Sequence, residues 1–273
     1  MWPAPAKLNL FLHVVGRRPD GYHLLQTVFR FIDRADGLRF EPRNDERIVL
    51  ATPLPGVAPD SDLTVRAARL LQTATGCRRG VTIHLDKQLP MGGGLGGGSS
   101  DAATVLLALD HLWQTGLGRP ALQQIGLSLG ADVPVFIHGR NTFAEGVGER
   151  FTDVELPAAT YLVLKPPVNV PTAAIFTAPE LVRDTPAISA AAWRPGQGGN
   201  DLQSVACARF PVVAEHLNWL RQFAPQAMMT GSGACVFAAF ADRREAEVVL
   251  ARLPAEMSGW IADGLDEHPI AKI

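Results

Sequence analysis

A run of glycines near residue 95 carries the clearest chemical signal in the chain. From Leu89 to Ala103 it reads L-P-M-G-G-G-L-G-G-G-S-S-D-A-A, with six glycines in seven residues. Glycine lets the backbone adopt positive φ and approach a ligand where a Cβ would clash. A helix predicted over Ala102–Trp113 follows, with Ser99, Ser100 and Asp101 at its start. Because a helix N-terminus offers unpaired N–H groups and partial positive charge, the segment predicts an anion site, most simply for phosphate.

Three other interpretations of the glycine run are weaker. A flexible linker would not be flanked by a β-like run over Val81–Leu85 and an amphipathic helix. The P-loop pattern fails because no lysine precedes Ser99. A dinucleotide fingerprint fits Gly92, Gly94 and Gly97, but so glycine-rich a run satisfies such patterns by chance. We therefore expect substitution of Gly96 to weaken phosphate binding more than it weakens the fold.

Composition sets the outer limits on what the chain can do. Its 273 residues suffice for one large or two modest domains. With 25 basic against 27 acidic side chains, it lacks the basic excess of a nucleic-acid-binding protein. The sequence shows neither an apolar run of membrane-spanning length nor a secretory leader, which favours a cytoplasmic protein without a membrane partner. Cys77, Cys207 and Cys235 are too scattered for a disulfide framework or a zinc site, so we expect reduced thiols.

Helical and strand patterns alternate along the whole chain. A helix is predicted over Leu63–Thr75, capped by Asp62 and closed by Gly76. The β pattern restarts at Tyr161–Leu164, close to Pro157, which marks a candidate domain boundary. The remaining predicted strands are Lys7–Val15, Leu24–Ile32, Leu38–Glu41, Ile48–Ala51, Asn141–Val147 and Cys235–Phe240, and the remaining helices are Pro120–Leu129, Asp201–Arg209, Val212–Trp219 and Arg243–Arg252, with a turn over Gly130–Phe136.

Five short motifs in order resemble a known family. They are P-A-K-L-N-L-F-L from Pro5, D-G-Y-H from Asp20, the glycine loop, L-G-A-D-V-P-V-F from Leu129 and T-G-S-G-A-C-V-F from Thr230. Together they resemble the GHMP superfamily of small-molecule kinases, and within it the branch that phosphorylates a cytidine diphosphate-linked methylerythritol in the non-mevalonate isoprenoid pathway. The resemblance implies an α+β fold with the active site in an interdomain cleft, residues 1–153 forming an ATP-binding domain and residues 154–273 a substrate-binding domain.

The resemblance also implies the catalytic residues. Asp132 matches the family's catalytic aspartate, which would accept the proton of the 2-hydroxyl group attacking the γ-phosphate of ATP. Lys7 matches the lysine that contacts this aspartate and the attacking oxygen, where it would stabilise charge on the transferred group. From the residues alone, a helix cap is the favoured interpretation of Asp132 and a solvated strand residue that of Lys7; only their place within the family motifs reverses this.

For ATP and Mg²⁺ the resemblance implies a contiguous site. Ser99 or Ser100 could coordinate the Mg²⁺ ion, whose other ligands are mainly phosphate oxygens and water. The motifs assign the ion no carboxylate ligand. Lys87 matches a lysine near the nucleotide, although an exposed lysine after a strand is the plain alternative. The expected ATP-binding residues are Lys87, Pro90, Met91, Gly92, Gly93, Gly94, Leu95, Gly96, Gly97, Gly98, Ser99 and Ser100.

The cytidine end of the substrate is implied to lie on aromatic rings. Tyr22 and Phe176 carry over as faces for the cytosine ring, and His23 as the polar partner of its edge. Asn9 and Thr172 are expected to make polar contacts with substrate. The motifs indicate no oligomeric state and no partner beyond the small-molecule substrate.

One residue departs from the family pattern. Asp62 stands where we expect asparagine. Either residue can cap a helix, but an ionised aspartate cannot donate a hydrogen bond, so a contact with adenosine at this position is in doubt. Catalysis should survive the change.

The rival functions are those of a homoserine or mevalonate kinase and of a catalytically silent nucleotide sensor. A nicotinamide-dependent oxidoreductase is disfavoured because no acidic residue stands at the expected distance after a second strand.

Overall fold

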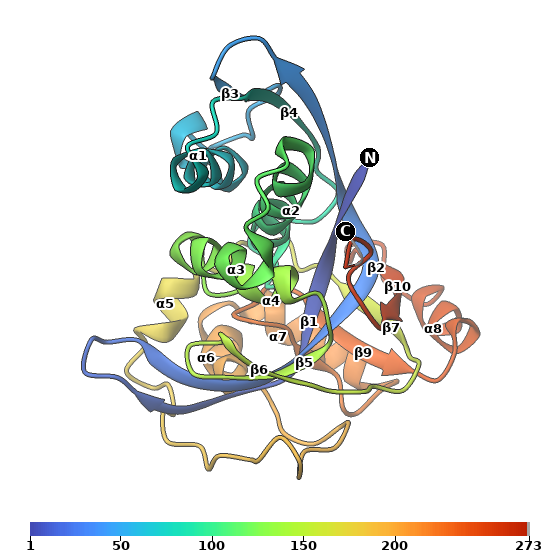
Figure 1. Cartoon of the computed structure of the whole chain (residues 1–273). Coiled ribbons are helices and arrows are strands. Elements are labelled where there is room, and N and C mark those ends of the chain that lie inside the picture. Colours follow the sequence, from blue (N-terminus) through green and yellow to red (C-terminus); the bar gives the residue numbers. More distant parts are fainter. Residues whose placement is uncertain (272–273) are drawn as a thin grey trace.

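A long antiparallel hairpin forms the spine of the molecule, whose computed structural model describes residues 1–271. Its arms are β1 (Trp2–Arg17) and β2 (His23–Arg43), drawn in blue in Figure 1. The sequence predicts two strands where β2 is continuous, and that prediction is wrong. Asp33 and Arg34 project into solvent at a bulge opposite Pro5 and Ala6, so a polar stretch interrupts the pattern without ending the strand.

The other strands join β2 in a mixed sheet of ten strands within the described chain. Its main path runs β3-β4-β2-β10-β7-β9-β8, while β1 and β5 also pair with β2 and β6 pairs with β5. Because β2 has 21 residues, it can pair with different strands along its length. The shorter strands are β3 (Ile48–Leu50), β4 (Gly80–Asp86), β5 (Thr142–Glu145), β6 (Arg150–Asp153), β7 (Thr160–Leu164), β8 (Met228–Met229), β9 (Val236–Phe240) and β10 (Gly259–Leu265).

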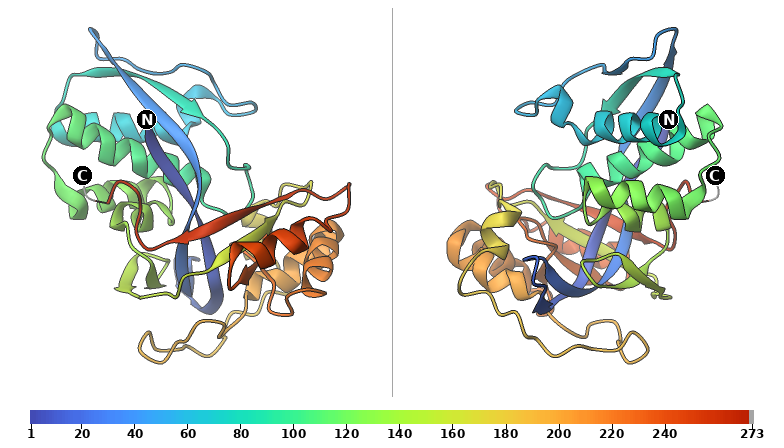
Figure 2. Two further views of the ribbon diagram at one scale, coloured as in Figure 1. Left: turned by 90° about the vertical axis from the view of Figure 1, so that its right-hand side faces the viewer. Right: turned by 60° about the vertical axis from the view of Figure 1, so that its left-hand side comes forward.

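Helices gather in two groups that stay apart in both views of Figure 2. One group, α1 to α4, packs on the upper part of the hairpin, and the other contains α5 to α7 near its lower part. In the described residues no helix is both long and apolar enough to span a bilayer. The helices are α1 (Leu63–Thr75), α2 (Gly97–Trp113), α3 (Gly118–Leu129), α4 (Val133–His138), α5 (Thr172–Phe176), α6 (Asp201–Arg209), α7 (Pro211–Arg221) and α8 (Arg243–Leu250), with a 3₁₀ turn η1 (Pro59–Ser61).

Two large hydrophobic clusters underlie the two groups of helices. Buried side chains of α1, α2 and α4 form one cluster, and those of α6, α7 and β9 belong to the other. Each cluster also takes residues from the opposite end of the chain, since Leu12 and Val14 of β1 lie in the second and Ile270 lies in the first. The two cores therefore share the hairpin, and a boundary between residues 153 and 154 stays a prediction.

Several helices have the predicted bounds for the predicted reasons. Helix α1 covers Leu63–Thr75, where Asp62 accepts a hydrogen bond from the Thr64 amide at 2.8 Å and Gly76 closes the helix at φ 66°. Helix α6 likewise begins at Asp201 and ends at Arg209. The patterns are too short to reveal α5, β6 and β8, and they also missed β10.

Two expectations near the glycine loop are wrong. Helix α2 begins at Gly97, inside the glycine run, because Gly96 makes the turn at φ 72° and the residues after it are already helical. Ser99, Ser100 and Asp101 are therefore within the helix and do not cap it. The turn expected over Gly130–Phe136 is in large part helix α4, which begins at Val133 with Pro134 in its first turn.

Candidate active site

One large cavity of about 1020 Å³ lies where the glycine loop, the hairpin and α5 meet. Its wall contains every residue predicted for the site except Ser100, whose side chain is fully buried. The sequence therefore brings together residues that lie up to about 170 positions apart, from Lys7 on β1 to Phe176 on α5.

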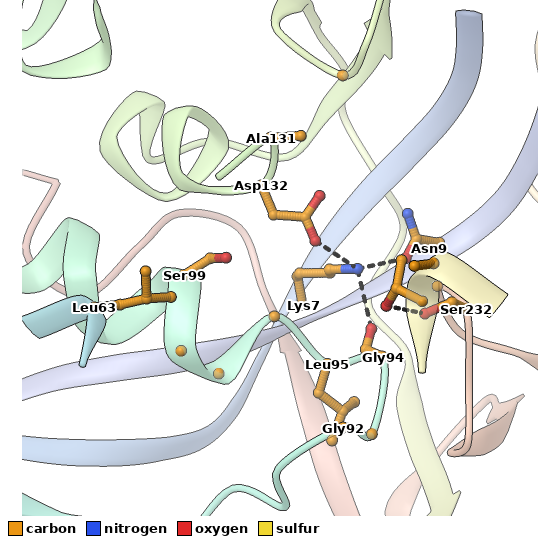
Figure 3. Close-up of a pocket in the computed structure, with 18 of the residues that line it drawn as sticks. Lys7, Asn9, Leu63, Gly92, Gly94, Leu95, Ser99, Ala131, Asp132 and Ser232 are labelled. Carbon is orange, nitrogen blue, oxygen red and sulfur yellow. Dashed lines mark hydrogen bonds and ion pairs between the residues drawn. The ribbon is translucent and has the colours of Figure 1, made fainter. Parts of the chain in front are cut away.

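Lys7 is held at the centre of the cavity wall by three oxygen atoms (Figure 3). Its ammonium donates to Asn9 Oδ1 at 2.6 Å and to the Gly94 carbonyl at 3.0 Å, and lies 3.3 Å from Asp132 Oδ2. The residue is only 2% exposed. The alternative of a solvated strand lysine is thus wrong, because β1 directs this side chain inward.

Asp132 stands just before α4 but does not cap it. Its side chain makes no capping hydrogen bond, and its carboxylate faces Lys7 while remaining about one-third exposed to the cavity. The helix-cap interpretation is therefore wrong. A carboxylate that is open on one side and paired with an ammonium on the other can accept a proton from a bound hydroxyl group.

Asn9 acts on Lys7 and on the frame around it. Its amide oxygen accepts from Lys7, and its amide nitrogen donates to Thr27 Oγ1 at 2.9 Å. Its backbone N–H donates to Thr230 Oγ1 at 3.1 Å. Because its side chain is buried in these contacts, Asn9 fixes where the lysine stands; a direct contact with substrate stays a prediction.

The glycine loop is clamped between the two halves of the chain. Ala234 N–H donates to Gly92 O at 3.1 Å and Cys235 N–H to Gly93 O at 3.2 Å, while Lys7 N–H donates to Leu95 O at 3.0 Å. Gly94 has φ 73°, and a Cβ there would overlap the Thr230 carbonyl oxygen. The glycines therefore allow close packing inside the protein as well as exposure of backbone to the cavity.

Helix α2 points its N-terminus at the cavity. Ser100 N–H donates to Gly96 O at 2.8 Å, so the amides of Gly97, Gly98 and Ser99 precede the first turn's hydrogen bonds and can meet an anion. Ser99 lines the cavity, and its Oγ lies near Gly130, next to the segment that carries Asp132. Of the two predicted serines, only Ser99 has its hydroxyl placed for a ligand.

Lys87 lies beneath the loop in a buried cluster with two carboxylates. Its ammonium is 2.5 Å from Asp36 Oδ2 and 2.7 Å from Asp101 Oδ2. Burial alone would lower the pKa of Lys87, but the charges of Asp101 and Asp36 outweigh it and raise the pKa. Lys87 still lines the cavity. Its charge is largely balanced by protein groups, so it braces the loop, and a contact with nucleotide stays a prediction.

At the other end of the cavity, aromatic side chains form an open platform. The rings of His23 and Phe176 have centroids 5.1 Å apart, and Tyr22, which precedes His23 in sequence, lines the same cavity and is 63% exposed. Thr172 Oγ1 hydrogen-bonds Ser232 Oγ at 2.8 Å, which joins α5 to the T-G-S-G turn. An exposed tyrosine in the same cavity as two other rings provides a surface suited to a flat aromatic group such as a nucleobase.

The geometry thus combines an anion-binding helix end, a lysine–aspartate pair and an aromatic platform in one cavity. Two family models match the chain: GHMP kinases N terminal domain over residues 62–140 and GHMP kinases C terminal over residues 187–259. A 4-diphosphocytidyl-2-C-methyl-D-erythritol kinase from Dechloromonas aromatica is 78% identical over the full length of both chains. The chain belongs to this kinase family.

Other comparisons agree with that membership. The enzyme of the same name from Thiobacillus denitrificans is 62% identical over 98% of this chain and 96% of its own. A crystal structure of 4-(cytidine 5'-diphospho)-2C-methyl-D-erythritol kinase superposes with a TM-score of 0.82 at 36% identity, covering 96% of this chain and 98% of that one. A mevalonate kinase, at 13% identity and a TM-score of 0.72 over 97% of this chain and 99% of its own, shares the fold. As a GHMP kinase, the protein uses ATP.

Sequence reasoning missed the residues that support the site. Asp36 and Asp101 hold Lys87, while Thr27 and Thr230 hold Asn9. The sequence could have indicated that Asp101 belongs to the site, because this residue directly follows Ser100 in the glycine motif. It gave no such indication for Asp36, which lies in a polar stretch of β2 that resembles a surface loop.

Two glycines of the loop allow its two roles to be separated. We predict that Gly98→Ala keeps or slightly raises stability, since a Cβ there meets only Leu63 Cδ1 at 3.4 Å and alanine favours a helix by about 0.8–1 kcal/mol. The same methyl group crowds the first-turn amides, so the KM for ATP should rise. Gly96→Ala, with φ 72° and Phe136 Cζ at 2.9 Å, should lower the melting temperature.

This pair also revises the expectation for Gly96, whose substitution strains the fold as well as the ligand site. Thermal melts and ATP titration by calorimetry on both variants measure the difference. Equal ATP affinity in wild type and in a folded Gly98→Ala variant would show that no phosphate approaches the backbone there.

The buried cluster beneath the loop predicts a pH effect on stability. Burial raises the pKa of Asp101 to about 8 despite the nearby Lys87. From about pH 4 to 8 the folded protein then holds a proton that the unfolded chain has released, so this group's contribution to stability falls as pH rises. Asp101→Asn should stabilise the protein, and by more at pH 8 than at pH 5.

Asp36→Asn is the matched control for that prediction. Asp36 Oδ1 accepts from the amides of Gln88 and Leu89 at 2.6 and 2.7 Å, and Oδ2 accepts from Lys87, so both oxygens of the carboxylate are hydrogen-bonded. Removal of its negative charge in Asp36→Asn should therefore lower the free energy of unfolding at both pH values. Urea unfolding at the two pH values measures both variants, and a destabilised Asp101→Asn protein would contradict the assignment.

Proposed function

We propose that the protein transfers the γ-phosphoryl group of ATP to the 2-hydroxyl of 4-diphosphocytidyl-2-C-methyl-D-erythritol, a step of the non-mevalonate isoprenoid pathway. The observation that carries the proposal is the position of the Lys7–Asp132 pair, 3.3 Å apart, in the same cavity as the α2 N-terminus and the Tyr22 platform. A phosphate donor on one side and a nucleotide-linked alcohol on the other would place their reacting groups at this pair.

In this proposal Asp132 accepts the proton of the attacking 2-hydroxyl. The Lys7 ammonium faces that carboxylate and stabilises negative charge that builds on the transferred group. Asn9 and the Gly94 carbonyl hold the ammonium in place, so little reorganisation is needed when the charge develops. The amides of Gly97, Gly98 and Ser99 receive the phosphate oxygens of ATP.

Mg²⁺ fits this site as an ion bound mainly by phosphate. In the described part of the chain no cluster of three or more histidine, cysteine or acidic side chains could hold a metal. Ser99 offers a hydroxyl group in the first turn of α2, and the remaining ligands would be phosphate oxygens and water. When bound, the ion would neutralise charge on the β- and γ-phosphates.

Tyr22, His23 and Phe176 are proposed to bind the cytosine ring. Two rings enclose the flat base, and the imidazole faces its hydrogen-bonding edge. Thr172, hydrogen-bonded to Ser232, would orient the diphosphate-linked half of the substrate nearby. The far end of the cavity, lined by Asp62 and Leu63, is left for adenosine.

ATP turnover with the cytidine substrate, set beside mevalonate and homoserine, tests the proposal. Phosphorylation of the cytidine compound at a kcat/KM far above the other two is the expected result. Preferential turnover of mevalonate or homoserine would assign the site to another GHMP kinase activity, and ATP binding without transfer to any of the three would favour a nucleotide sensor.

A further inference from the structure

An arginine behind the cavity holds the imidazole of His23. We propose that Arg183 is a positioning residue for base recognition: it fixes the tautomer of His23 and so the sense of the hydrogen bond that the imidazole offers to the substrate base. The inference rests on the proposed function, because it assigns the base-recognising role to His23.

The contacts of Arg183 leave its guanidinium little freedom. Its Nε–H donates to His23 Nε2 at 3.0 Å. Its Nη1 donates to the Leu181 carbonyl at 2.8 Å, and its Nη2 donates to the carbonyls of Phe176 at 3.0 Å and Ala178 at 2.7 Å. The planar fork therefore ties the end of α5 to the start of β2 through fixed donor directions.

An arginine can only donate, so the nitrogen that it contacts must accept. Nε2 of His23 therefore carries no proton, and in the neutral ring the proton sits on Nδ1. Burial, followed by the charges of Arg183 and Arg17, lowers the pKa of His23, which favours the neutral ring. His23 thus presents a ring N–H as its remaining polar group in the cavity that it lines.

A fixed N–H donor distinguishes the two pyrimidines by their N3 atoms. N3 of cytosine accepts a hydrogen bond, whereas N3 of uracil carries a hydrogen and would face the imidazole N–H unpaired. Without Arg183 the ring could take the other tautomer and turn an acceptor to the base, which would suit uracil. Arg183 also holds the Phe176 carbonyl, so it orients a face and an edge of the base site together.

The test uses Arg183→Met with Arg209→Met as the matched control. Arg209 also anchors α5, through the Ala174 carbonyl at 2.9 Å and Glu180 at 2.8 Å, but among the described residues it forms no hydrogen bond with His23. Nitrogen chemical shifts of the His23 ring, assigned by comparison with His23→Gln, report the tautomer in the free enzyme. Steady-state kinetics compare the cytidine substrate with its uridine analogue.

We expect the Nδ1–H form in wild type and in Arg209→Met, and a shift toward Nε2–H in Arg183→Met. In Arg183→Met the ratio of kcat/KM for the cytidine substrate to that for its uridine analogue should fall about tenfold, because the KM values change. The kcat and the KM for ATP should stay as in wild type. Arg183→Lys, which keeps charge but not the planar fork, should behave like the methionine variant and serves if that variant fails to fold.

The possible failures have distinct signatures. An Nε2–H ring in the wild type, or an unchanged ring in Arg183→Met, overturns the role of Arg183. A changed tautomer with an unchanged base preference overturns the link between His23 and the base. Neither result alters ATP-dependent phosphorylation, whose absence in wild type would instead contradict the proposed function.

Discussion

Asp132→Asn lowers kcat by about 10²- to 10⁴-fold, the range expected on loss of a positioned general base, while the fold and ATP binding persist. The expectation follows from the position of Asp132, whose carboxylate caps no helix and faces Lys7 at 3.3 Å. Asparagine has the same shape but cannot accept the hydroxyl proton. Steady-state kinetics, with calorimetric ATP titration as the binding control, measure the loss.

Lys7→Ala should reduce kcat by a similar factor. The double variant should be little worse than the worse single one, because residues that act as one unit have non-additive effects. Lys7 also touches Asn9 and the Gly94 carbonyl, so melting temperatures must accompany the rates. Near-normal turnover in Asp132→Asn would remove this residue from the role, and multiplicative losses would mean that the two groups work independently.

Tyr22→Ala should weaken binding of the cytidine substrate by about 1–3 kcal/mol, by analogy with base stacking on aromatic side chains. Because this side chain is 63% exposed in the free protein, its removal should leave stability almost unchanged. The KM for ATP should also change little, since the adenosine is assigned to the opposite end of the cavity. Binding isotherms for both ligands measure the effect.

Val182→Ala is a suitable control for Tyr22→Ala, because Val182 is also exposed and apolar, at 55%, but does not line the cavity. It should change neither affinity. A rise in the KM for ATP in Tyr22→Ala, with the cytidine substrate unaffected, would mean that the two nucleotides occupy the reverse ends of the cavity.

The parts of the fold that could be predicted are those governed by local chemistry. Asp62 and Gly76 mark the ends of α1 because a capping carboxylate and a left-handed glycine act within a few residues of themselves. Strand β2 could not be read correctly, because its continuity across Asp33 and Arg34 depends on a bulge against β1. Strand β10 was missed for a similar reason: its register is set by β7 and β2, which lie far away in sequence.

The site shows the same division. Residues inside motifs, such as Lys7 and Asp132, could be named from the sequence because each motif keeps its own spacing. What the lysine touches could not be named, since Asn9 reaches Thr230 across 221 positions. Lys87 and the two acidic side chains that enclose it also come from three separate segments, so a lysine that looks exposed in sequence is largely buried in the folded protein.

The bond between Asn9 and Thr230 has a consequence for how the protein is made. Asn9 leaves the ribosome well before Thr230, which lies 221 positions later and accepts a hydrogen bond from its backbone N–H. The carbonyls of Gly92 and Gly93 likewise gain their hydrogen bonds only after Ala234 and Cys235 have been synthesised. Such distant pairings slow folding, because the intervening chain must be ordered first. A nascent chain that stops before Thr230 would therefore carry both catalytic side chains but lack the hydrogen bond that ties Asn9, the partner of Lys7, to the second half of the protein.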